Sequence, residues 1–355
     1  MSKICHVFFV FMTTMVLCAM DEAISKYYDL AKQFEVHEMA APPKWALREE
    51  PPLFQIAWLT DQHITDVDST KISHDALAYV RDVVRPAAVV ITGDNIGTSP
   101  KGFKNATPTL QRQRDFRDML KKSLGETPCW VIPGDNWPKD FEKVFGATHY
   151  SFDFGGFHFI FNSVDATGQS NGCSRFGEET WKWLQADLAA HPGQPTIYLQ
   201  HEPCLPPSFL DAPKLSELFS KTPQLLLALA GHLHLDLEFR SQHWTQWDGP
   251  SVGRSHRPGF KVLSFYPDQI VATSIEWDSA NRHFRPVNKF QRVQIPKALR
   301  GGLHRPEPGE TRNGYCELPP APLENDPRLD ELAHTVMENV KAFGVRYTLR
   351  KVIQE

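Results

Sequence analysis

The 355-residue sequence lacks several features that would place it in a common class of protein. It has no excess of basic residues, because 38 Lys and Arg stand against 42 Asp and Glu, which gives a formal net charge of -4. Without a basic field, the sequence carries no nucleic-acid-binding signature. Its six cysteines form no Cys-x-x-Cys motif, which argues against a zinc knuckle. Hydrophobic residues make up 41% and charged residues 23%, the balance of a soluble globular protein.

The sequence also lacks an apolar run long enough to span a membrane. Residues 4–19 are apolar and follow a single basic residue, Lys3, whereas a membrane span needs about 20 apolar residues. The run resembles the apolar region of a signal peptide, and small residues at Ala19 and Ala23 are candidate cleavage positions. We therefore predict a signal peptide over residues 1–20 and a secreted or periplasmic protein. An uncleaved leader would instead make the protein membrane-anchored.

The rest of the sequence divides into three regions. Residues 21–52 begin with apolar residues at helical spacing and continue with prolines, which predicts an N-terminal helix and a Pro-rich lead-in. Residues 53–283 form the predicted central domain. Residues 284–355 are rich in Pro, Arg, Glu and Asn and predict a C-terminal extension, either wrapped over the domain or acting as a linker. A terminal helix is predicted over residues 327–343, and its apolar stripe would pack on the domain or mediate self-association.

Five apolar runs in the central domain predict buried strands of an α/β sheet. They are FQIAWLT, AAVVIT, CWVIP, TIYLQ and LLLALA, and their Val, Ile, Leu and Trp content is typical of strands covered on both faces. Amphipathic spacing predicts helices over residues 70–84, 110–124 and 178–188. Two further strands, FKVLSFY and QIVATSIEW, follow in the last part of the domain. Strands that alternate with helices indicate a layered α/β domain.

Each of the five apolar runs is followed directly by a short polar motif. In chain order the motifs are Asp61-Gln62-His63, Gly93-Asp94-Asn95, Gly134-Asp135-Asn136, His201-Glu202-Pro203 and Gly231-His232-Leu233-His234. Ligands of α/β sheets bind beyond the carboxyl ends of the strands, so we expect these side chains to meet at one edge of one sheet. Converging His, carboxylate and amide side chains are what a pair of divalent metals needs.

The order of these motifs resembles that of the calcineurin-like metallophosphoesterases, over about residues 53–278. The segment Tyr150–Ile160 and the helix before the His201 strand are also similar to that family. The resemblance implies an α/β fold, a four-layer α/β/β/α sandwich of the metallophosphoesterase type. It also implies a metal-dependent hydrolase that cleaves phosphodiesters or phosphomonoesters by attack of a metal-bridging hydroxide. The partner would then be a small phosphate-ester substrate.

The resemblance further implies two divalent or trivalent metal ions and a set of ligands for each. The first ion would be held by Asp61, His63 and His234, and the second by Asp135, His201 and His232. Asp94 would bridge both ions, because a carboxylate can offer one oxygen to each cation. Sites built from His and carboxylate suit Mn, Fe, Zn or Co, and the sequence does not choose among them.

The third motif departs from the family pattern, which is normally Gly-Asn-His. On a gap-free reading, Asp135 takes the ligand position and Asn136 replaces a His that is thought to protonate the leaving group. On a shifted reading, Asn136 is the ligand and Trp137 replaces the His. We favour the first reading, because the glycine directly precedes the ligand in the family, and Asn136 then occupies the catalytic position. The departure leaves an alternative function open, a catalytically weak or inactive metal-containing binding module.

The loops after the last motif contain side chains that suit contacts with a phosphate or a base. Arginine can pair with phosphate oxygens, and tryptophan can stack on a base. The residues of this kind are Arg240, Trp244 and Arg254.

The missing histidine generates a prediction about leaving groups. Loss of a positioned acid typically costs about 10²–10⁴-fold in rate when the departing oxygen needs a proton. Nitrophenyl and anhydride-like esters should therefore be hydrolysed far faster than simple alkyl esters, and Asn136→His should accelerate the alkyl esters selectively. The measurement is kcat/KM for an ester series plotted against the pKa of the leaving group. A flat plot for the unaltered chain would contradict the prediction.

Overall fold

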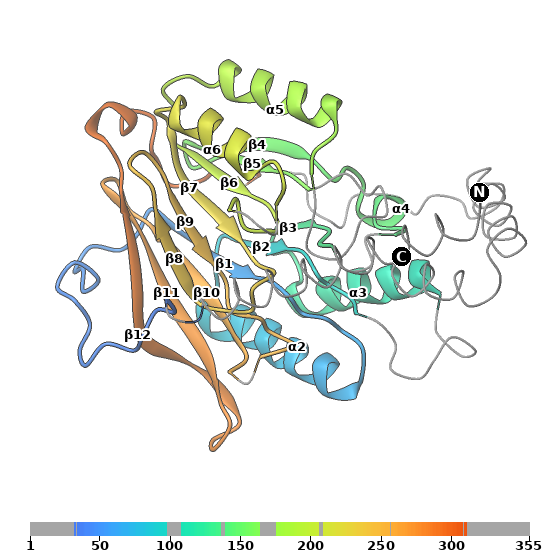
Figure 1. The fold of residues 1–355 in the computed structure, drawn as a ribbon. Helices are drawn as coiled ribbons and strands as arrows, with labels where there is room; N and C mark the ends of the chain where they lie inside the picture. The colour runs from blue at the N-terminus through green and yellow to red at the C-terminus, as the bar shows by residue number, and fades with distance from the viewer. Residues whose placement is uncertain are drawn as a thin grey trace, which may run out of the picture.

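The computed structural model describes residues 32, 34–97, 108–135, 139–163, 175–205, 209–255, 257–307 and 309–310 (Figure 1). The predicted signal peptide, most of the predicted N-terminal helix, Asn136 and the predicted 327–343 helix lie outside these residues. Within the described part of the chain, no helix combines the length and the apolar character needed to cross a bilayer.

Two six-stranded sheets form the centre of the domain. The strands of the first sheet are β1 (Phe54–Leu59), β2 (Ala88–Thr92), β3 (Cys129–Ile132), β10 (Gly259–Phe265), β11 (Gln269–Asp278) and β12 (His283–Gln294), in the spatial order β12-β11-β10-β1-β2-β3. The strands of the second are β4 (Tyr150–Phe154), β5 (Phe157–Phe161), β6 (Thr196–Leu199), β7 (Leu225–Ala230), β8 (Leu237–Arg240) and β9 (Thr245–Asp248), in the order β4-β5-β6-β7-β9-β8. Parallel pairing joins β1, β2 and β3 in one sheet and β5, β6, β7 and β9 in the other.

Alternating side chains of the strands build the core on both sides of each sheet. In β1, Ile56 and Trp58 face the second sheet, whereas Ala57 and Leu59 face the helices, as the two-residue period of a strand requires. The layer between the sheets is rich in aromatic rings. For example, the rings of Phe54 and Phe265 stack with centroids 4.4 Å apart.

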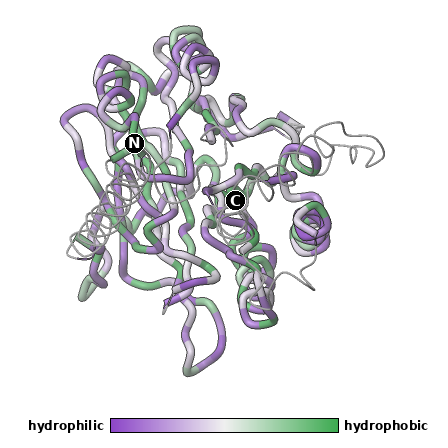
Figure 2. Tube along the Cα trace, turned by 45° about the vertical axis from the view of Figure 1, so that its right-hand side comes forward, coloured by the Kyte–Doolittle hydropathy of each residue, from purple (hydrophilic) through white to green (hydrophobic). Residues whose placement is uncertain are grey.

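Helices cover the outer face of each sheet. The first sheet carries α2 (Val67–Tyr79), continued by a π-helical turn (Val80–Val84), together with α3 (Thr109–Leu124) and α4 (Glu142–Phe145). The second carries α5 (Glu178–Ala190) and α6 (Ala212–Ser220). A 3-10 turn (Lys297–Leu299) follows β12. Hydrophobic and hydrophilic residues alternate along these helices, as expected for elements with one face on the core (Figure 2). The predicted α/β/β/α sandwich is therefore confirmed.

The expectation that all five motifs meet at the edge of one sheet is wrong. Three of the motif-bearing strands, β1, β2 and β3, lie in the first sheet, whereas β6 and β7 lie in the second. All five strands are apolar and buried, so their sequences cannot distinguish one sheet from two. The motifs meet because the sheets are stacked with these strand ends on the same side (Figure 1).

The predicted domain boundary at residue 283 lies too early in the chain. Residues 283–294 form β12, which pairs antiparallel with β11 at the edge of the first sheet. Its charged residues and Pro286 suggested an extended tail. An edge strand tolerates both, because one side of its backbone needs no partner and proline is accepted there.

A buried histidine fastens the second sheet to its covering helix. His158 on β5 is 2.8 Å from an oxygen of Asp153 through Nδ1 and 2.8 Å from an oxygen of Asp187 on α5 through Nε2. Ser151 donates a hydrogen bond to the other oxygen of Asp187. Burial alone would lower the pKa of His158, but its hydrogen bonds to the Asp187 and Asp153 carboxylates raise it above its ordinary value. Asp153, His158 and His191 also bring ligand atoms within 4.8 Å of one another. Both nitrogens of His158 are already engaged by carboxylates, and Nδ1 of His191 is 2.8 Å from the Asp187 carbonyl.

This arrangement predicts a pH-dependent contribution of His158 to stability. A group whose pKa is raised by folding stabilises the fold fully below its unfolded pKa, and this contribution is lost as pH rises through the folded pKa. His158→Gln should therefore cost about 2 kcal/mol near pH 6, the range for hydrogen bonds to charged groups, and less above the raised pKa. Urea unfolding at the two pH values measures the difference, with the exposed His283→Gln as control. An equal loss at both pH values would mean that His158 acts through packing alone.

Candidate metal centre

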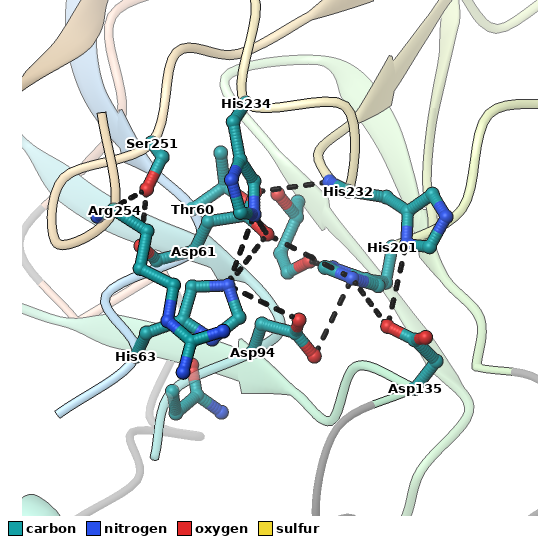
Figure 3. Close-up of polar contacts among 12 residues, drawn as sticks. Thr60, Asp61, His63, Asp94, Asp135, His201, His232, His234, Ser251 and Arg254 are labelled. Atoms are coloured by element: carbon teal, nitrogen blue, oxygen red, sulfur yellow. Dashed lines mark hydrogen bonds and ion pairs between the residues drawn. The ribbon is translucent and has the colours of Figure 1, made fainter. Parts of the chain in front are cut away.

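All seven predicted metal ligands are described, and the structure brings them together where the two sheets meet (Figure 3). Each follows the carboxyl end of its strand, where the backbone turns away from the sheet. Ligand atoms within each group lie less than 4.8 Å from one another, and the groups are Asp61–His63–His234, Asp135–His201–His232 and Asp61–Asp94–His201. The first two groups match the two predicted ligand sets.

Asp94 lies between the two groups and offers one oxygen to each. Its Oδ2 is 3.4 Å from Nε2 of His63, and its Oδ1 is 3.4 Å from Nε2 of His201 (Figure 3). This is the position that a carboxylate bridging two cations needs.

Asp61 uses its two oxygens differently. Its Oδ2 accepts hydrogen bonds from the Thr60 hydroxyl at 2.8 Å and from the backbone N–H of His232 at 2.9 Å. Its Oδ1 is buried and accepts no hydrogen bond within the described residues, yet it lies 3.2 Å from Nε2 of His234. One oxygen thus fixes the carboxylate, and the other is left for a cation.

His201, like Asp61, is held by a hydrogen bond through one atom while another atom faces the centre. Nδ1 of His201 donates to the Thr92 carbonyl at 2.8 Å, so Nε2, which faces Asp135 Oδ1 at 3.1 Å, is the nitrogen that a metal ion can use. Nε2 of His63 and Nε2 of His234 are only 3.0 Å apart. Two ring nitrogens that face each other need a proton or a cation between them. The donor set therefore fits a pair of metal ions, and two ions are expected at this centre.

Asp135 occupies the position that the gap-free reading of the third motif gives it. Its Oδ1 is 3.1 Å from Nε2 of His201 and 3.3 Å from Nδ1 of His232. Burial alone would raise the pKa of Asp135, but the charge of His232 and the hydrogen bonds with both histidines hold it well below its ordinary value. Burial alone would lower the pKa of His232, but Asp135 raises it to about 9.

Burial and neighbouring charges also have opposite effects on the pKa values of Asp61 and His201. Burial alone would raise the pKa of Asp61, but the charges of His234 and His201 hold it well below its ordinary value. Burial alone would lower the pKa of His201, but the charges of Asp94 and Asp61 raise it well above its ordinary value. Asp61 and Asp135 are therefore anionic, and they need positive charge beside them.

The backbone at this centre is strained. Five of the seven predicted ligands have a positive φ, which side chains with a Cβ rarely adopt, and they are Asp61, His63, Asp94, His232 and His234. Strain of this kind typically costs about 1–3 kcal/mol per residue and concentrates at functional sites. Two motif glycines permit the close packing behind the ligands. A Cβ at Gly134 would overlap the Asp94 carboxylate, and one at Gly231 would overlap the Thr60 hydroxyl.

A loop that the motifs do not include clamps the Asp61 segment. The Ser251 hydroxyl donates to the Asp61 carbonyl at 2.8 Å, and the N–H of Gly253 donates to the same carbonyl at 3.0 Å. The N–H of Val252 donates to the Thr60 carbonyl at 3.2 Å. Nothing in the sequence marks these residues, because their contact depends on two strands that are far apart in the chain.

Of the three side chains proposed for substrate contacts, only Arg254 lies beside the centre. Figure 3 shows its side chain running from the loop toward His63. Trp244 is buried against Phe219 in the core under α6, so its assignment to the substrate is wrong. Arg240 forms an ion pair with Glu238 on the same strand.

A buried ion pair tethers the segment that follows His234 to the first sheet. Lys261 on β10 donates to Asp236 and, at 2.6 Å, to the side-chain oxygen of Gln291. The other oxygen of Asp236 accepts a hydrogen bond from the Ser274 hydroxyl at 2.6 Å. Burial lowers the pKa of Lys261, although Asp236 opposes this shift. The tether fixes the end of the ligand loop. Breaking it would be costly, because removing one partner of a buried pair leaves an uncompensated charge.

Comparison with known proteins gives relatives by sequence and by fold. No family model matches the chain. It is 25% identical over 266 residues to a 3′,5′-cyclic-nucleotide phosphodiesterase from Nostoc sp., which covers 65% of this chain and 94% of the relative. It is 24% identical over 255 residues to a probable cyclic nucleotide phosphodiesterase from Fibrobacter succinogenes, which covers 64% of this chain and 91% of the relative.

A solved structure supports the fold independently. The structure of a dimetal phosphatase from Danio rerio superposes with a TM-score of 0.51, and the match covers 69% of this chain and all of that one. At 14% identity, this similarity bears on the fold alone.

The extra carboxylate of the third motif predicts tight binding at the second metal position. Replacing an anionic ligand by a neutral one lowers affinity for a cation, so Asp135→Asn should weaken binding of one Mn²⁺ by about 10–100-fold. Calorimetric titration of the metal-stripped protein with Mn²⁺ measures both affinities. The exposed Asp118→Asn is the matched control. Unchanged binding in Asp135→Asn would remove Asp135 from the ligand set.

Proposed function

We propose that this chain, a calcineurin-like metallophosphoesterase that hydrolyses phosphate esters with two metal ions, acts on phosphodiesters and takes nucleotide diesters as substrates. The observation that carries the proposal is the placement of Asp94, whose two oxygens face His63 and His201 in separate ligand groups. The chemical class of the substrate is inferred from both sequence relatives, which are named as cyclic-nucleotide phosphodiesterases.

The residues assigned as ligands divide into two equal sets around Asp94. Each set has two imidazoles and one carboxylate besides the shared one, namely Asp61, His63 and His234 on one side and Asp135, His201 and His232 on the other. Mixed imidazole and carboxylate sites suit Mn, Fe, Zn or Co, and the two carboxylates at each position favour Mn or Fe. When bound, two such cations lower the pKa of water and stabilise charge on phosphate oxygens.

The protein contributes charge balance and orientation to this chemistry. Three ligand carboxylates carry -3 and two divalent cations carry +4, so one positive charge remains to attract an anionic ester. The hydrogen bonds to Asp61 Oδ2 and His201 Nδ1 hold these two ligands in fixed orientations. Fixed donors cost no reorganisation during the reaction, which is how such sites favour the transition state. A binding module without turnover is the less supported alternative, because the relatives are named as enzymes.

The test is turnover by the reconstituted protein. The metal-stripped chain, loaded with Mn²⁺, should hydrolyse bis-p-nitrophenyl phosphate faster than p-nitrophenyl phosphate. Asp94→Asn should lose about 10²–10³-fold or more in kcat, because it removes charge from both cation positions at once. Asp118→Asn should keep the full rate. Faster hydrolysis of the monoester would reverse the assignment to phosphodiesters, and no turnover with two Mn²⁺ bound would exclude the enzyme.

A further inference from the structure

A cavity of about 510 Å³ opens beside the candidate metal centre. Its wall includes Thr65, two residues after the ligand His63, and Gly253 and Arg254 from the clamping loop. The opposite wall is formed by α2 and the end of β11, which contribute Lys71 and Trp277. The volume lies within the usual range of roughly 300–1,000 Å³ for small-molecule sites. Its position makes it the natural place for the part of a substrate that extends away from the metals.

Arg254 joins this cavity to the metal centre, and its backbone position is fixed. Its N–H donates to the Ser251 hydroxyl at 2.8 Å, and that hydroxyl in turn donates to the Asp61 carbonyl. Gly253 packs so closely that a Cβ there would overlap the carbonyl oxygen of Gln62. The loop therefore holds Arg254 in register with the first metal ligand, which is the preorganisation that a binding residue needs.

The guanidinium of Arg254 forms no hydrogen bond or ion pair within the described residues, although its side chain points toward His63 (Figure 3). Bound metal ions would repel this guanidinium, and none of the carboxylates that line the cavity, Asp66, Asp68 and Asp75, forms an ion pair with it. A bound anion between the metals and the guanidinium would remove this repulsion. Arginine also matches the geometry of phosphate oxygens with two parallel hydrogen bonds. The position therefore fits a contact with the phosphate of the substrate.

The far wall of the cavity combines an aromatic face with a second unpaired guanidinium. The indole of Trp277 is half-buried, and Nζ of Lys71 lies 5.9 Å from its ring centroid. Lys71 is already paired with Asp75 at 2.5 Å. Arg282, which also lines the cavity, makes no side-chain hydrogen bond or ion pair within the described residues. A planar group that can stack and accept hydrogen bonds suits this wall, and a nucleobase has both properties.

We propose that this cavity binds the nucleoside part of a nucleotide ester while Arg254 contacts its phosphate, an inference that rests on the proposed phosphodiesterase function. Arg254 is then a catalytic residue in the sense that it touches the reacting group. Trp277 determines specificity, because it contacts only the nucleoside.

The test separates binding from turnover. Calorimetry with the Mn²⁺-loaded full chain compares adenosine 5′-monophosphate with methyl phosphate, which lacks the nucleoside. The wild-type protein should bind the nucleotide about tenfold tighter or more, the range that stacking of one base provides. Arg254→Met should weaken binding of both probes by about 10–100-fold. Trp277→Leu should remove the preference for the nucleotide and leave binding of methyl phosphate unchanged. The exposed Arg257→Met, on the same loop but outside the cavity, should change neither.

Turnover is measured in parallel with thymidine 5′-p-nitrophenyl phosphate and methyl p-nitrophenyl phosphate, which share one leaving group. The ratio of their kcat/KM values should follow the binding preference in every variant. If Trp277→Leu does not fold, Trp277→Phe keeps the packing on Phe284 and should still reduce the preference by a few-fold.

The outcomes distinguish the two proposals. Turnover of both diesters without a nucleoside preference overturns the cavity assignment and leaves the phosphodiesterase intact. A preference in binding without turnover overturns the phosphodiesterase and supports the cavity assignment. Equal binding by Arg254→Met and the wild-type protein, or no binding of either probe, overturns the role of Arg254.

Discussion

The rest of this structure depends on one electrostatic constraint, the burial of three carboxylates beside one another. Asp61, Asp94 and Asp135 are at most 7% exposed. Nearby histidines hold the pKa values of Asp61 and Asp135 well below the ordinary value, so these two carboxylates stay anionic. Burying an uncompensated charge costs several kcal/mol or more, so such a cluster persists only with positive charge inside it. Protonated His201 and His232 supply that charge in the absence of metal, and two cations supply it when they are bound. His201 and His232 therefore have two uses, as candidate ligands and as the groups that compensate the buried carboxylates when no metal is bound.

The sandwich supplies the geometry that this constraint demands. Strand ends from two stacked sheets place ligands on opposite sides of a small volume, which a single row of strands could not do. This geometry strains the backbone, because five of the candidate ligands have positive φ. The surroundings hold them there through the Ser251 clamp on one side and the Lys261–Asp236 tether on the other. The clamp and the tether both connect the ligand loops to the packed core. The packed sheets therefore make the centre rigid.

The sequence predicts well which side chains come together at the centre and predicts their environment poorly, for a physical reason. Asp61 and His232 follow directly after apolar strands, and that local pattern can be recognised without knowing which strands are neighbours. The distribution of strands over two sheets, the edge strand β12 and the clamp by Ser251 depend on long-range pairing, which leaves no local trace. Trp244 illustrates the limit. An indole near a ligand loop has the same sequence signature whether it contacts a substrate or, as here, packs against Phe219.

Asp135 and Arg254 separate two tasks, which are binding of the metal ions and attraction of the anionic ester. An additional carboxylate among the ligands strengthens the hold on cations, but it also lowers the net positive charge that attracts an anionic ester. A guanidinium outside the ligand set restores positive charge on the substrate side without competing for the metals. Because the clamp ties Arg254 to the Asp61 carbonyl, that charge stays at a fixed position relative to the centre. Affinity for metal can then rise without a matching loss of affinity for the phosphate, because different residues set each one.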